Sequence, residues 1–371
     1  MGKRILLLGD YSNCQRTLAS ALRTMGHDVT LISDGSGWMN CDRDISLNRY
    51  PGKMGGLLFY LDLRFRLHPR LRDYDIVSVH DPNFLKLKPH RIRYFFDRLK
   101  EDNNTVFLNA MSTDLPFLNM LERKDSPLRY SEWFVDGMAN RMRLERNREW
   151  EEWHAQELAE YQKYFYSRID GAVATLYEYY HGLREALPPE KVHYAGMPID
   201  TSLYTPVIYP EKIKKVKLFL GRDRNRKLLK GSDYLETAAR RVVEKYPDKA
   251  ELRIVENVPF NQFIDELRGA HVVLDQIYSY TPATTALMAM SMGLNVVSGG
   301  EPDYYDFIGE KENRPIINAS LTIEELTDTI ERIVMHPEEL AERGAAGRRF
   351  VEKHNSHLTV AGRYLNSWGI K

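Results

Sequence analysis

The chain has 371 residues, of which 43% are hydrophobic and 28% are charged, and its 52 basic side chains balance 52 acidic ones. This length suggests two domains, each large enough to bury its own core. Neutrality argues against proteins that coat polyanions, because such binding needs a net basic surface. Two cysteines, Cys14 and Cys41, exclude a disulfide scaffold and a cysteine-based zinc site.

The apolar segments of the chain are short. The N-terminal run at 5–8 is too short for the core of a secretory signal. The longest stretch, at 285–297, falls short of the roughly 20 residues that span a bilayer. We therefore expect a cytoplasmic protein.

Two parts of the chain show the same succession of patterns. Apolar, β-rich runs at 4–8 and 28–32 flank Gly9 and a helical pattern, and runs at 215–220 and 251–255 flank Gly221 and a second helical pattern. Strand, turn, helix and strand make a βαβ unit. Two such units predict an α/β fold of two doubly wound, Rossmann-like domains that face a central cleft.

Further strands are predicted at 76–80, 104–109, 171–175, 191–195, 271–275 and 295–298, and further helices at 89–100, 141–167, 178–186, 261–268, 284–292, 337–354 and 357–368. Pro198, Pro206 and Pro210 indicate a linker. We expect an N-terminal domain at 1–198, a C-terminal domain at 199–355, and a last helix at 356–371 that packs back on the first domain. Such sheets bind ligands beyond the carboxyl ends of their strands, which places the expected site in the cleft.

A basic loop opens the second domain between a strand end and a helix start. Its five basic residues are Arg222, Arg224, Arg226, Lys227 and Lys230. The N–H groups at a helix start favour an anion, and arginine and lysine add fixed charge. The loop lacks the Walker pattern, and the Gly9 turn lacks a dinucleotide fingerprint. A solvated basic loop is the alternative, but the position at a strand–helix crossover favours a phosphate clamp.

The second half resembles the donor domain of retaining, family-4-type glycosyltransferases of the two-Rossmann (GT-B) architecture. In that family a basic residue and a Lys-Gly pair hold the donor diphosphate, which here implies Lys230 and Gly231 with Arg226, or with Arg222 as the other candidate. The stretches at 270–276, 286–297 and 299–305 resemble the family's "adv" strand, its "LEAMAxGxPVV" segment and the loop after that segment. The linker at 196–200 resembles the family's "NGVD" link. The resemblance covers residues 190–355 well and residues 1–35 loosely.

The sequence departs from the family at two glutamates that lie eight positions apart and contact the donor. Tyr280 and Met288 occupy those positions, and neither can accept a bidentate hydrogen bond from a ribose diol. Either the site is rebuilt, with Glu301, Asp275 or Tyr280 contacting the sugar, or the chain is a non-catalytic relative. The retained basic clamp favours a rebuilt site.

The loop after the strand at 271–275 supplies further donor candidates. Gln276, Tyr280, Thr281 and Thr284 carry amides and hydroxyls that could face a phosphate or a sugar. Packing of the tyrosines and capping of the next helix by Thr284 is the structural alternative.

In the first domain, polar residues follow three strands. His80 and Asp114 are candidate catalytic residues, together with Glu301 of the second domain. Asp10, Tyr11 and Asp81 are candidates for contact with the acceptor. Strand-end packing of His80 and a helix cap or turn at 112–114 are equally consistent with the sequence.

No metal and no cofactor are expected. The triplets Asp42-Arg43-Asp44 and Asp73-Tyr74-Asp75 do not follow apolar strands, so we interpret them as solvated turns. A diphosphate leaving group without a metal needs fixed cations, which Arg226 and Lys230 would supply.

Basic residues are concentrated in one part of the first domain. Between Asp42 and Lys100 there are thirteen lysines and arginines against seven aspartates, interleaved with apolar residues after 55–60. A solvated basic face is the ordinary interpretation. Peripheral contact with the inner face of an anionic membrane, or with a lipid-diphosphate acceptor, is the other.

The sequence therefore predicts a glycosyltransferase of the hexosyltransferase type that moves a sugar from a nucleotide diphosphate sugar to a glycan, lipid-linked or other acceptor. The resemblance implies retention of configuration and a role in polysaccharide biosynthesis, and no nucleic-acid partner is expected. Two alternatives stay open: a non-catalytic protein that binds sugar nucleotides or glycans, and a nucleotide-sugar epimerase of the same architecture.

Overall fold

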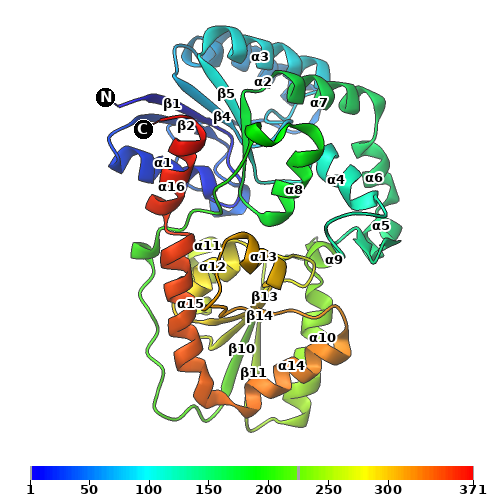
Figure 1. Cartoon of the computed structure of the whole chain (residues 1–371), viewed down its shortest axis with the longest axis vertical. Coiled ribbons are helices and arrows are strands. Elements are labelled where there is room, and N and C mark those ends of the chain that lie inside the picture. The colour runs from blue at the N-terminus through cyan, green and yellow to red at the C-terminus, as the bar shows by residue number, and fades with distance from the viewer. Residues whose placement is uncertain (1, 224–225, 371) are drawn as a thin grey trace. The chain divides into compact units, whose positions relative to one another are not determined.

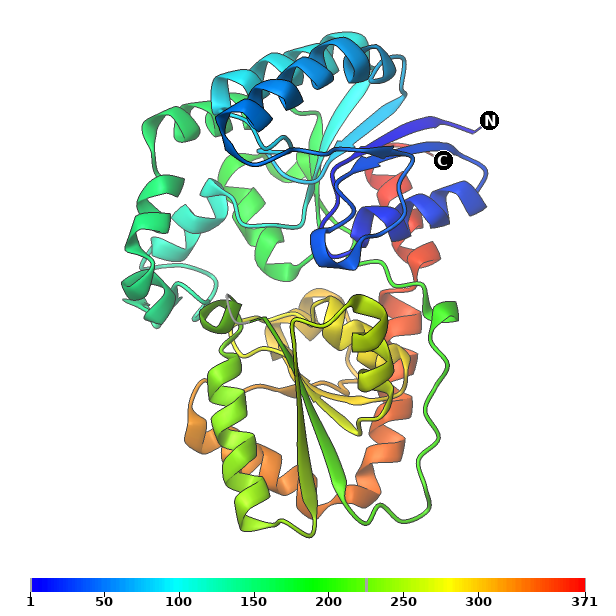
Figure 2. The same ribbon diagram turned by 180° about the vertical axis from the view of Figure 1, so that it is seen from behind.

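The computed structural model describes residues 2–223 and 226–370 (Figures 1 and 2). The chain forms two compact units. Unit 1 contains Met1–Arg123, Arg148–Pro198 and His357–Lys371, and unit 2 contains Lys124–Asn147 and Ile199–Ser356. Each unit is built on its own parallel sheet, so the predicted α/β fold with two doubly wound domains is confirmed.

Unit 1 contains a seven-stranded parallel sheet in the order β3-β2-β1-β4-β5-β8-β9. Its strands are β1 (Arg4–Leu8), β2 (Asp28–Ser33), β3 (Ile45–Ser46), β4 (Ile76–Val79), β5 (Thr105–Ala110), β8 (Gly171–Ala174) and β9 (Val192–Tyr194). Its helices include α1 (Cys14–Thr24), α2 (Gly52–Asp62), α3 (Pro89–Asp102), α4 (Leu115–Glu122), α7 (Gln156–Arg168), α8 (Tyr177–Ala186) and α16 (His357–Ser367).

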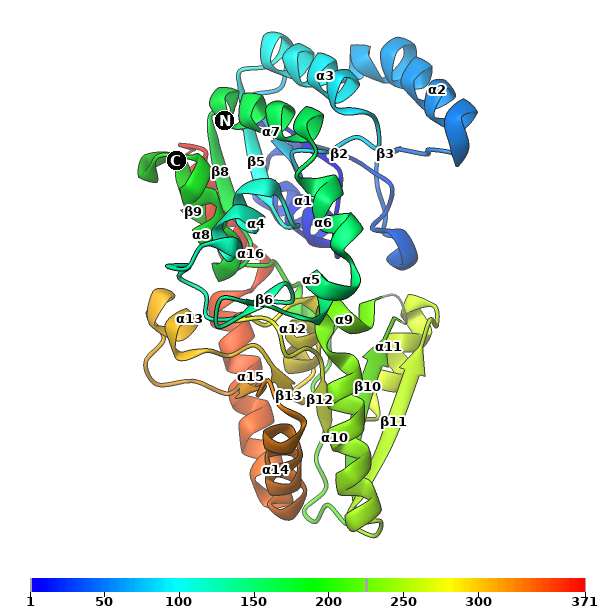
Figure 3. The same cartoon turned by 90° about the vertical axis from the view of Figure 1, so that its right-hand side faces the viewer.

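The alternation of β1 explains why this sheet is covered on both faces. Leu6 and Leu8 pack into the core beneath α2, α3, α7 and α8, whereas Ile5 and Leu7 pack into the core beneath α1 and α16. Successive side chains of a strand point to opposite faces, so an all-apolar strand needs two helical layers. Figure 3 shows α2 and α3 together on one of these layers.

Unit 2 contains a five-stranded parallel sheet in the order β11-β10-β12-β13-β14. Its strands are β10 (Val216–Arg222), β11 (Ala250–Glu256), β12 (Val272–Leu274), β13 (Asn295–Ser298) and β14 (Ile317–Asn318). Its helices include α9 (Lys227–Lys230), α10 (Ser232–Lys245), α11 (Phe260–Arg268), α12 (Thr284–Ser291), α13 (Pro302–Phe307), α14 (Ile323–Met335) and α15 (Leu340–His354).

The segment 124–147, which we call the arm, lies in a different domain from the one predicted. We expected it in the N-terminal domain, but it belongs to unit 2. It carries the hairpin β6 (Phe134–Val135) and β7 (Met138–Ala139) and the short helix α5 (Arg141–Glu145). The helix expected at 141–167 is divided into α5, α6 (Asn147–Trp153) and α7, because Arg146 after α5 has a ψ of 39° and Ala155 before α7 has an extended ψ of 134°.

The last helix, α16, lies in unit 1 and packs against α1. Its Tyr364 is fully buried and donates a hydrogen bond of 2.5 Å to Oδ1 of Asn109 in β5. The described helices include none that is both long and apolar enough to cross a lipid bilayer.

Candidate functional site

The candidate site of unit 2 begins where α9 meets α10. Gly231 joins the two helices in the left-handed region, with φ +64° and ψ 28°. A Cβ atom at this position would lie 2.4 Å from Cγ1 of Ile277, in the loop after β12. Only glycine therefore allows the start of α10 to approach that loop so closely.

Lys230 is held at the carboxyl end of β12 by an ion pair. Its Nζ lies 2.7 Å from Oδ1 of Asp275, a carboxylate that is 1% exposed. The other oxygen of Asp275 accepts a hydrogen bond of 3.1 Å from Ser298, at the end of β13. The Lys230 side chain itself remains 21% exposed. The ammonium group is thus fixed at the sheet edge where α/β proteins bind ligands.

Arg222 has a different environment from Lys230. Its Nε donates to Glu256 at 2.7 Å, and its Nη1 pairs with Glu236. Two carboxylates therefore balance its charge, and these contacts support a structural role rather than a part in a phosphate clamp. Arg226 directly precedes α9 and is partly exposed. Arg224, also in the basic loop, lies outside the described residues.

Tyr280 packs against the arm. Its ring stacks on Tyr130, with 4.7 Å between centroids, and its hydroxyl accepts a hydrogen bond of 2.7 Å from the backbone N–H of Arg129. Burial raises the pKa of Tyr280. Tyr280, which we aligned with a glutamate of the family that the sequence resembles, therefore makes its contacts within the protein. The second replacement, Met288, is buried in α12.

The start of α12 lacks a side-chain cap. Thr284 is the first helical residue rather than the N-cap, and the N-cap residue Ala283 makes no capping hydrogen bond. Thr281 is buried, and its carbonyl accepts a hydrogen bond of 2.8 Å from Ser279. Gln276 is partly exposed, with its Nε2 3.5 Å from the same carbonyl oxygen. Thr284 therefore does not occupy the N-cap position of α12.

Glu301 lies directly before α13. Its Oε1 accepts hydrogen bonds from Tyr130 Oη at 2.7 Å and from Asn318 Nδ2 at 2.8 Å. Its backbone N–H donates to the Tyr280 carbonyl at 3.2 Å. The Glu301 carboxylate and Tyr280 thus contact the same residue of the arm.

The arm was not recognised as part of this site in the sequence analysis. Its Arg141 donates to Asp233, in the first turn of α10, at 2.7 Å, and this bond raises the pKa of Arg141 above its ordinary value. A signal for the hairpin was present, because Asp136 and Gly137 form an Asp-Gly turn with φ values of 50° and 73°. Nothing in the local sequence indicates which sheet the hairpin packs on.

Four of the first-domain candidates follow the ends of β1 and β4. His80 packs on Gly9 so closely that a Cβ there would lie 1.8 Å from its Nδ1. Asp10 is buried, which raises its pKa, and its Oδ1 accepts a hydrogen bond of 2.8 Å from the N–H of Gln15. Asp81 accepts hydrogen bonds from the hydroxyl of Ser112 and from the N–H of Asn83. Tyr11 is 41% exposed.

Asp114 has a structural role in this arrangement. It is the N-cap of α4, and its Oδ1 accepts a hydrogen bond of 3.0 Å from Phe117 N–H. Its other oxygen accepts the hydroxyl of Tyr166. Burial raises the pKa of Asp114 to about 6. Both oxygens are thus used within unit 1, and these contacts favour the helix-cap interpretation over the catalytic one.

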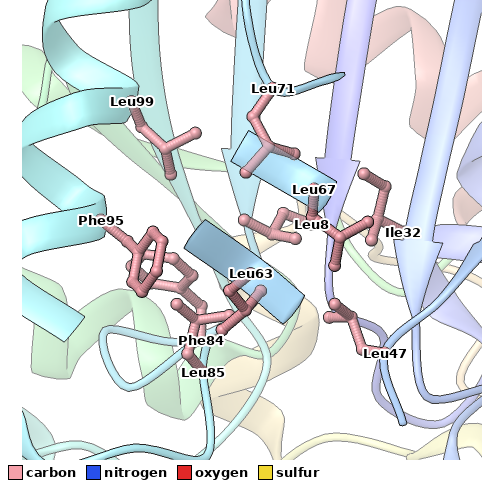
Figure 4. Close-up of a pocket in the computed structure, with 10 residues that line it drawn as sticks. All are labelled: Leu8, Ile32, Leu47, Leu63, Leu67, Leu71, Phe84, Leu85, Phe95 and Leu99. Atoms are coloured by element: carbon pink, nitrogen blue, oxygen red, sulfur yellow. The ribbon is translucent and has the colours of Figure 1, made fainter. Parts of the chain in front are cut away.

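A small cavity in unit 1 lies beneath the turn η2 (Leu63–Leu67), between β1, β2 and α3 (Figure 4). Its volume is about 10 Å³. Its lining is entirely apolar and consists of Leu8, Ile32, Leu47, Leu63, Leu67, Leu71, Phe84, Leu85, Phe95 and Leu99. A space of this size and lining offers no polar group to a sugar nucleotide. Among the described residues, no three His, Cys, Asp or Glu side chains are grouped to hold a metal ion.

Solved structures of known proteins share the fold. HepE of Anabaena, solved with UDP-glucose, matches with a TM-score of 0.60 and 10% identity over 99% of both chains. Sucrose-phosphate synthase of Thermosynechococcus elongatus matches with a TM-score of 0.60 and 14% identity over 99% of this chain and 98% of that one. A Listeria monocytogenes protein assigned as a UDP-N-acetylglucosamine 2-epimerase matches with a TM-score of 0.52 and 12% identity over 98% and 95%.

No protein-family model matches the sequence, and a search of curated proteins finds no significant match. The structural neighbours are mostly glycosyltransferases of the GT-B class. At these identities the likeness establishes the fold: this chain has the two Rossmann-like domains of GT-B proteins.

Proposed function

We propose that this protein transfers a glycosyl group from a nucleotide diphosphate sugar to a glycan or lipid-linked acceptor. Unit 2 holds the donor and unit 1 the acceptor. The observation that carries this proposal is the ammonium of Lys230, fixed 2.7 Å from Asp275 next to Gly231 at the carboxyl edge of the sheet. The fold shared with HepE, which was solved with UDP-glucose, supports the choice of donor class.

In this proposal, the leaving diphosphate is stabilised by fixed cations. Lys230, whose ammonium is already paired with Asp275, donates hydrogen bonds to the diphosphate, Arg226 supplies positive charge, and the N-terminal amides of α10 add partial positive charge. The sugar passes through an oxocarbenium-like transition state, as in glycoside hydrolysis. Retention of configuration, which the family resemblance implies, belongs to the proposal.

Sugar contacts are assigned to residues other than the missing glutamates. Tyr280 binds the arm through its hydroxyl, so Gln276, Thr284 and the second carboxylate oxygen of Glu301, whose Oε1 binds the arm, are the proposed donor-sugar contacts. On the acceptor side we retain His80, Asp10, Tyr11 and Asp81. Asp114 and Arg222 are left out because their polar groups serve unit 1 and unit 2 internally.

Donor binding can be tested by thermal shift with UDP-, GDP-, ADP- and dTDP-glucose at rising concentrations. The correct donor raises the melting temperature progressively, since ligand binding stabilises the native state by mass action. We expect the Arg226→Ala, Lys230→Ala variant to lower donor affinity at least tenfold, and Lys227→Ala, an exposed cation of the same loop, to leave it unchanged. Unchanged affinity in the double variant would refute the clamp.

A second variant separates loss of the clamp from loss of folding. Lys230→Ala leaves the buried Asp275 without its cation, which destabilises the protein. Lys230→Gln with Asp275→Asn removes both charges together and keeps side chains of similar size. We expect this double variant to fold like the wild type but to keep the low donor affinity of the clamp variant.

Product analysis distinguishes the alternatives. A transferase consumes the donor only in the presence of an acceptor, whereas an epimerase interconverts the sugar nucleotide alone. A non-catalytic relative binds the donor without turnover. The epimerase alternative has support at the level of fold from the Listeria structure.

A further inference from the structure

The outward side of α2 exposes an unusual amount of apolar surface. Met54, Leu58 and Phe65 are 68%, 54% and 73% exposed, and Leu57 and Leu61 are about 41% and 40% exposed. We call these five residues the outer face of α2. They recur at helical spacing along α2 and the π-helical turn η2 (Leu63–Leu67) that continues it.

The opposite side of the same helix is already used by the core. Phe59, Leu63 and Leu67 are buried against the sheet, and Gly55 and Gly56 are buried as well. The outer face is therefore additional apolar surface that the fold of unit 1 does not need. Contiguous exposed apolar surface of this kind marks an interaction site.

Cations border this apolar surface. Between residues 49 and 72 there are six lysines and arginines against one acid, Asp62, whereas the whole chain is neutral. At 100° per residue, Lys53 and Arg64 lie along one border of the outer face, whereas Arg66 on the other border is paired with Asp62. All three are exposed, and the guanidinium of Arg64 lies 4.8 Å from the ring centre of Tyr94 in α3.

We propose that the outer face of α2 is a docking surface for an anionic lipid bilayer. An apolar stripe bordered by lysine and arginine is the pattern of helices that lie in the plane of a membrane interface. The apolar side chains enter the acyl boundary while the cations remain among the anionic headgroups. A folded protein partner would need a surface matched in shape and charge. A fluid bilayer needs no fixed shape, and it offers an apolar interior beside anionic headgroups.

The helix geometry agrees with a position in the plane of the membrane. Residues 52–67 measure roughly 24 Å along the axis at about 1.5 Å per residue, and one side of this segment is occupied by the core of unit 1. Only the outer face is available to lipid. This surface is independent of the proposed transfer reaction, and its test needs no catalytic activity.

Co-sedimentation of the full chain with vesicles tests the proposal. We expect binding to phosphatidylcholine vesicles that contain about 30% phosphatidylglycerol, weaker binding at high salt, and little binding to phosphatidylcholine alone. Leu58→Glu with Phe65→Glu should lower partitioning at least tenfold. Both side chains are more than half exposed, so this variant should keep the far-ultraviolet circular dichroism of the wild type.

A matched control makes the same chemical change elsewhere. Leu144→Glu with Ile208→Glu replaces side chains that are 69% and 96% exposed in unit 2, and this variant should bind vesicles like the wild type. Lys53→Gln and Arg64→Gln should each weaken binding about fivefold.

Three results would overturn the proposal. The first is a wild type that ignores anionic vesicles at low salt, and the second is a Leu58→Glu, Phe65→Glu variant that binds as well as the wild type. The third is a dimer in analytical ultracentrifugation that this variant abolishes, without any vesicle binding, because the face would then bind a second copy of the chain.

Discussion

At the scale of single residues, the ion pair with Asp275 fixes the position of Lys230 in the candidate site. The carboxylate is almost completely buried and lies beside two donors, the ammonium of Lys230 and the hydroxyl of Ser298. Removing one partner of a buried pair typically costs about 3–5 kcal/mol, because the remaining charge is desolvated. The same pairing keeps the lysine in one position, so the phosphate that we propose binds there would not first have to order a flexible side chain.

Gly231 should be intolerant of any side chain. Alanine there combines a positive φ with a Cβ 2.4 Å from Cγ1 of Ile277. We expect Gly231→Ala to lower the free energy of unfolding by about 2–4 kcal/mol in urea titration, from backbone strain and overpacking together.

Gly309→Ala provides the matched control for this effect. Gly309 has a φ of +71°, but a Cβ at that position meets no atom within 4 Å. It should therefore cost only about 1 kcal/mol, from the left-handed backbone alone. Equal decreases in the free energy of unfolding of the two variants would show that the contact with Ile277 does not require glycine between α9 and α10.

Asp114 should make the stability of unit 1 depend on pH. Its folded-state pKa is raised to about 6 from the ordinary value of 3.8, so the folded state binds its proton more tightly than the unfolded state. The resulting stability is fully present below about pH 4 and is lost as the pH rises through about 6, with a total near 3 kcal/mol.

Asp114→Asn isolates this contribution. Asparagine can still cap α4 but cannot ionise. Relative to the wild type, its unfolding free energy should rise as the pH increases from about 4 to 6.5 and then stay constant. Urea titrations of both proteins across that range measure the difference. A difference that does not vary with pH would show that Asp114 titrates normally.

At the scale of elements, the arm is a part of unit 2 that the chain forms in the middle of unit 1. It leaves unit 1 after Arg123 and returns at Arg148, and between these points it packs on unit 2. Tyr130 contacts both Tyr280 and Glu301, while Arg141 contacts Asp233. The arm therefore contacts the loops that follow β12 and β13 and the helix α10, which comes after β10.

A double-mutant cycle can measure the contact between Tyr130 and Glu301. Tyr130→Phe removes the hydroxyl that donates to Glu301 at 2.7 Å, and Glu301→Gln removes the charge that accepts it. We expect a coupling energy of about 1–2 kcal/mol in the free energy of unfolding. Tyr130→Phe combined with Glu324→Gln, an acid of α14 that pairs with Arg241, should be additive. Additivity in the first pair as well would mean that this hydrogen bond does not hold the arm.

At the scale of the whole molecule, net charge and exposed apolar surface act together. The formal net charge is zero and the isoelectric point is about 7.2, so no long-range repulsion keeps copies apart near neutral pH. The outer face of α2 adds an apolar surface through which copies can associate in the absence of membrane.

Self-association should therefore decrease when the solution is acidified. Protonation of histidines, of which the chain has 11, gives a net positive charge at about pH 6. His27, His193 and His271 contribute less, because burial lowers the pKa of each. Dynamic light scattering should show smaller particles at about pH 6 than at about pH 7.2. The Leu58→Glu, Phe65→Glu variant should show little change, and a strong pH response in that variant would contradict this explanation.

Local sequence patterns were sufficient to predict most of the longer strands and helices. The strands β1 and β13 have the predicted bounds, and β10, β12, α11 and α12 lie within a few residues of theirs, because apolar runs and helical periodicity are properties of neighbouring residues. The short elements β3, β14, α4 and α13 were not predicted, since segments of two to eight residues carry little periodic signal.

The amino-acid sequence by itself therefore determined two parallel α/β units and the glycine at the junction where a basic loop meets a helix. Only the tertiary structure decided that Arg222 is neutralised by Glu236 and Glu256, that Asp114 serves as a helix cap bound by Tyr166, and that the arm belongs to unit 2. The physical reason is the range of the interactions. Periodicity is set by adjacent residues, whereas the partner of a charged or polar group is set by which distant segments the fold brings within hydrogen-bonding distance.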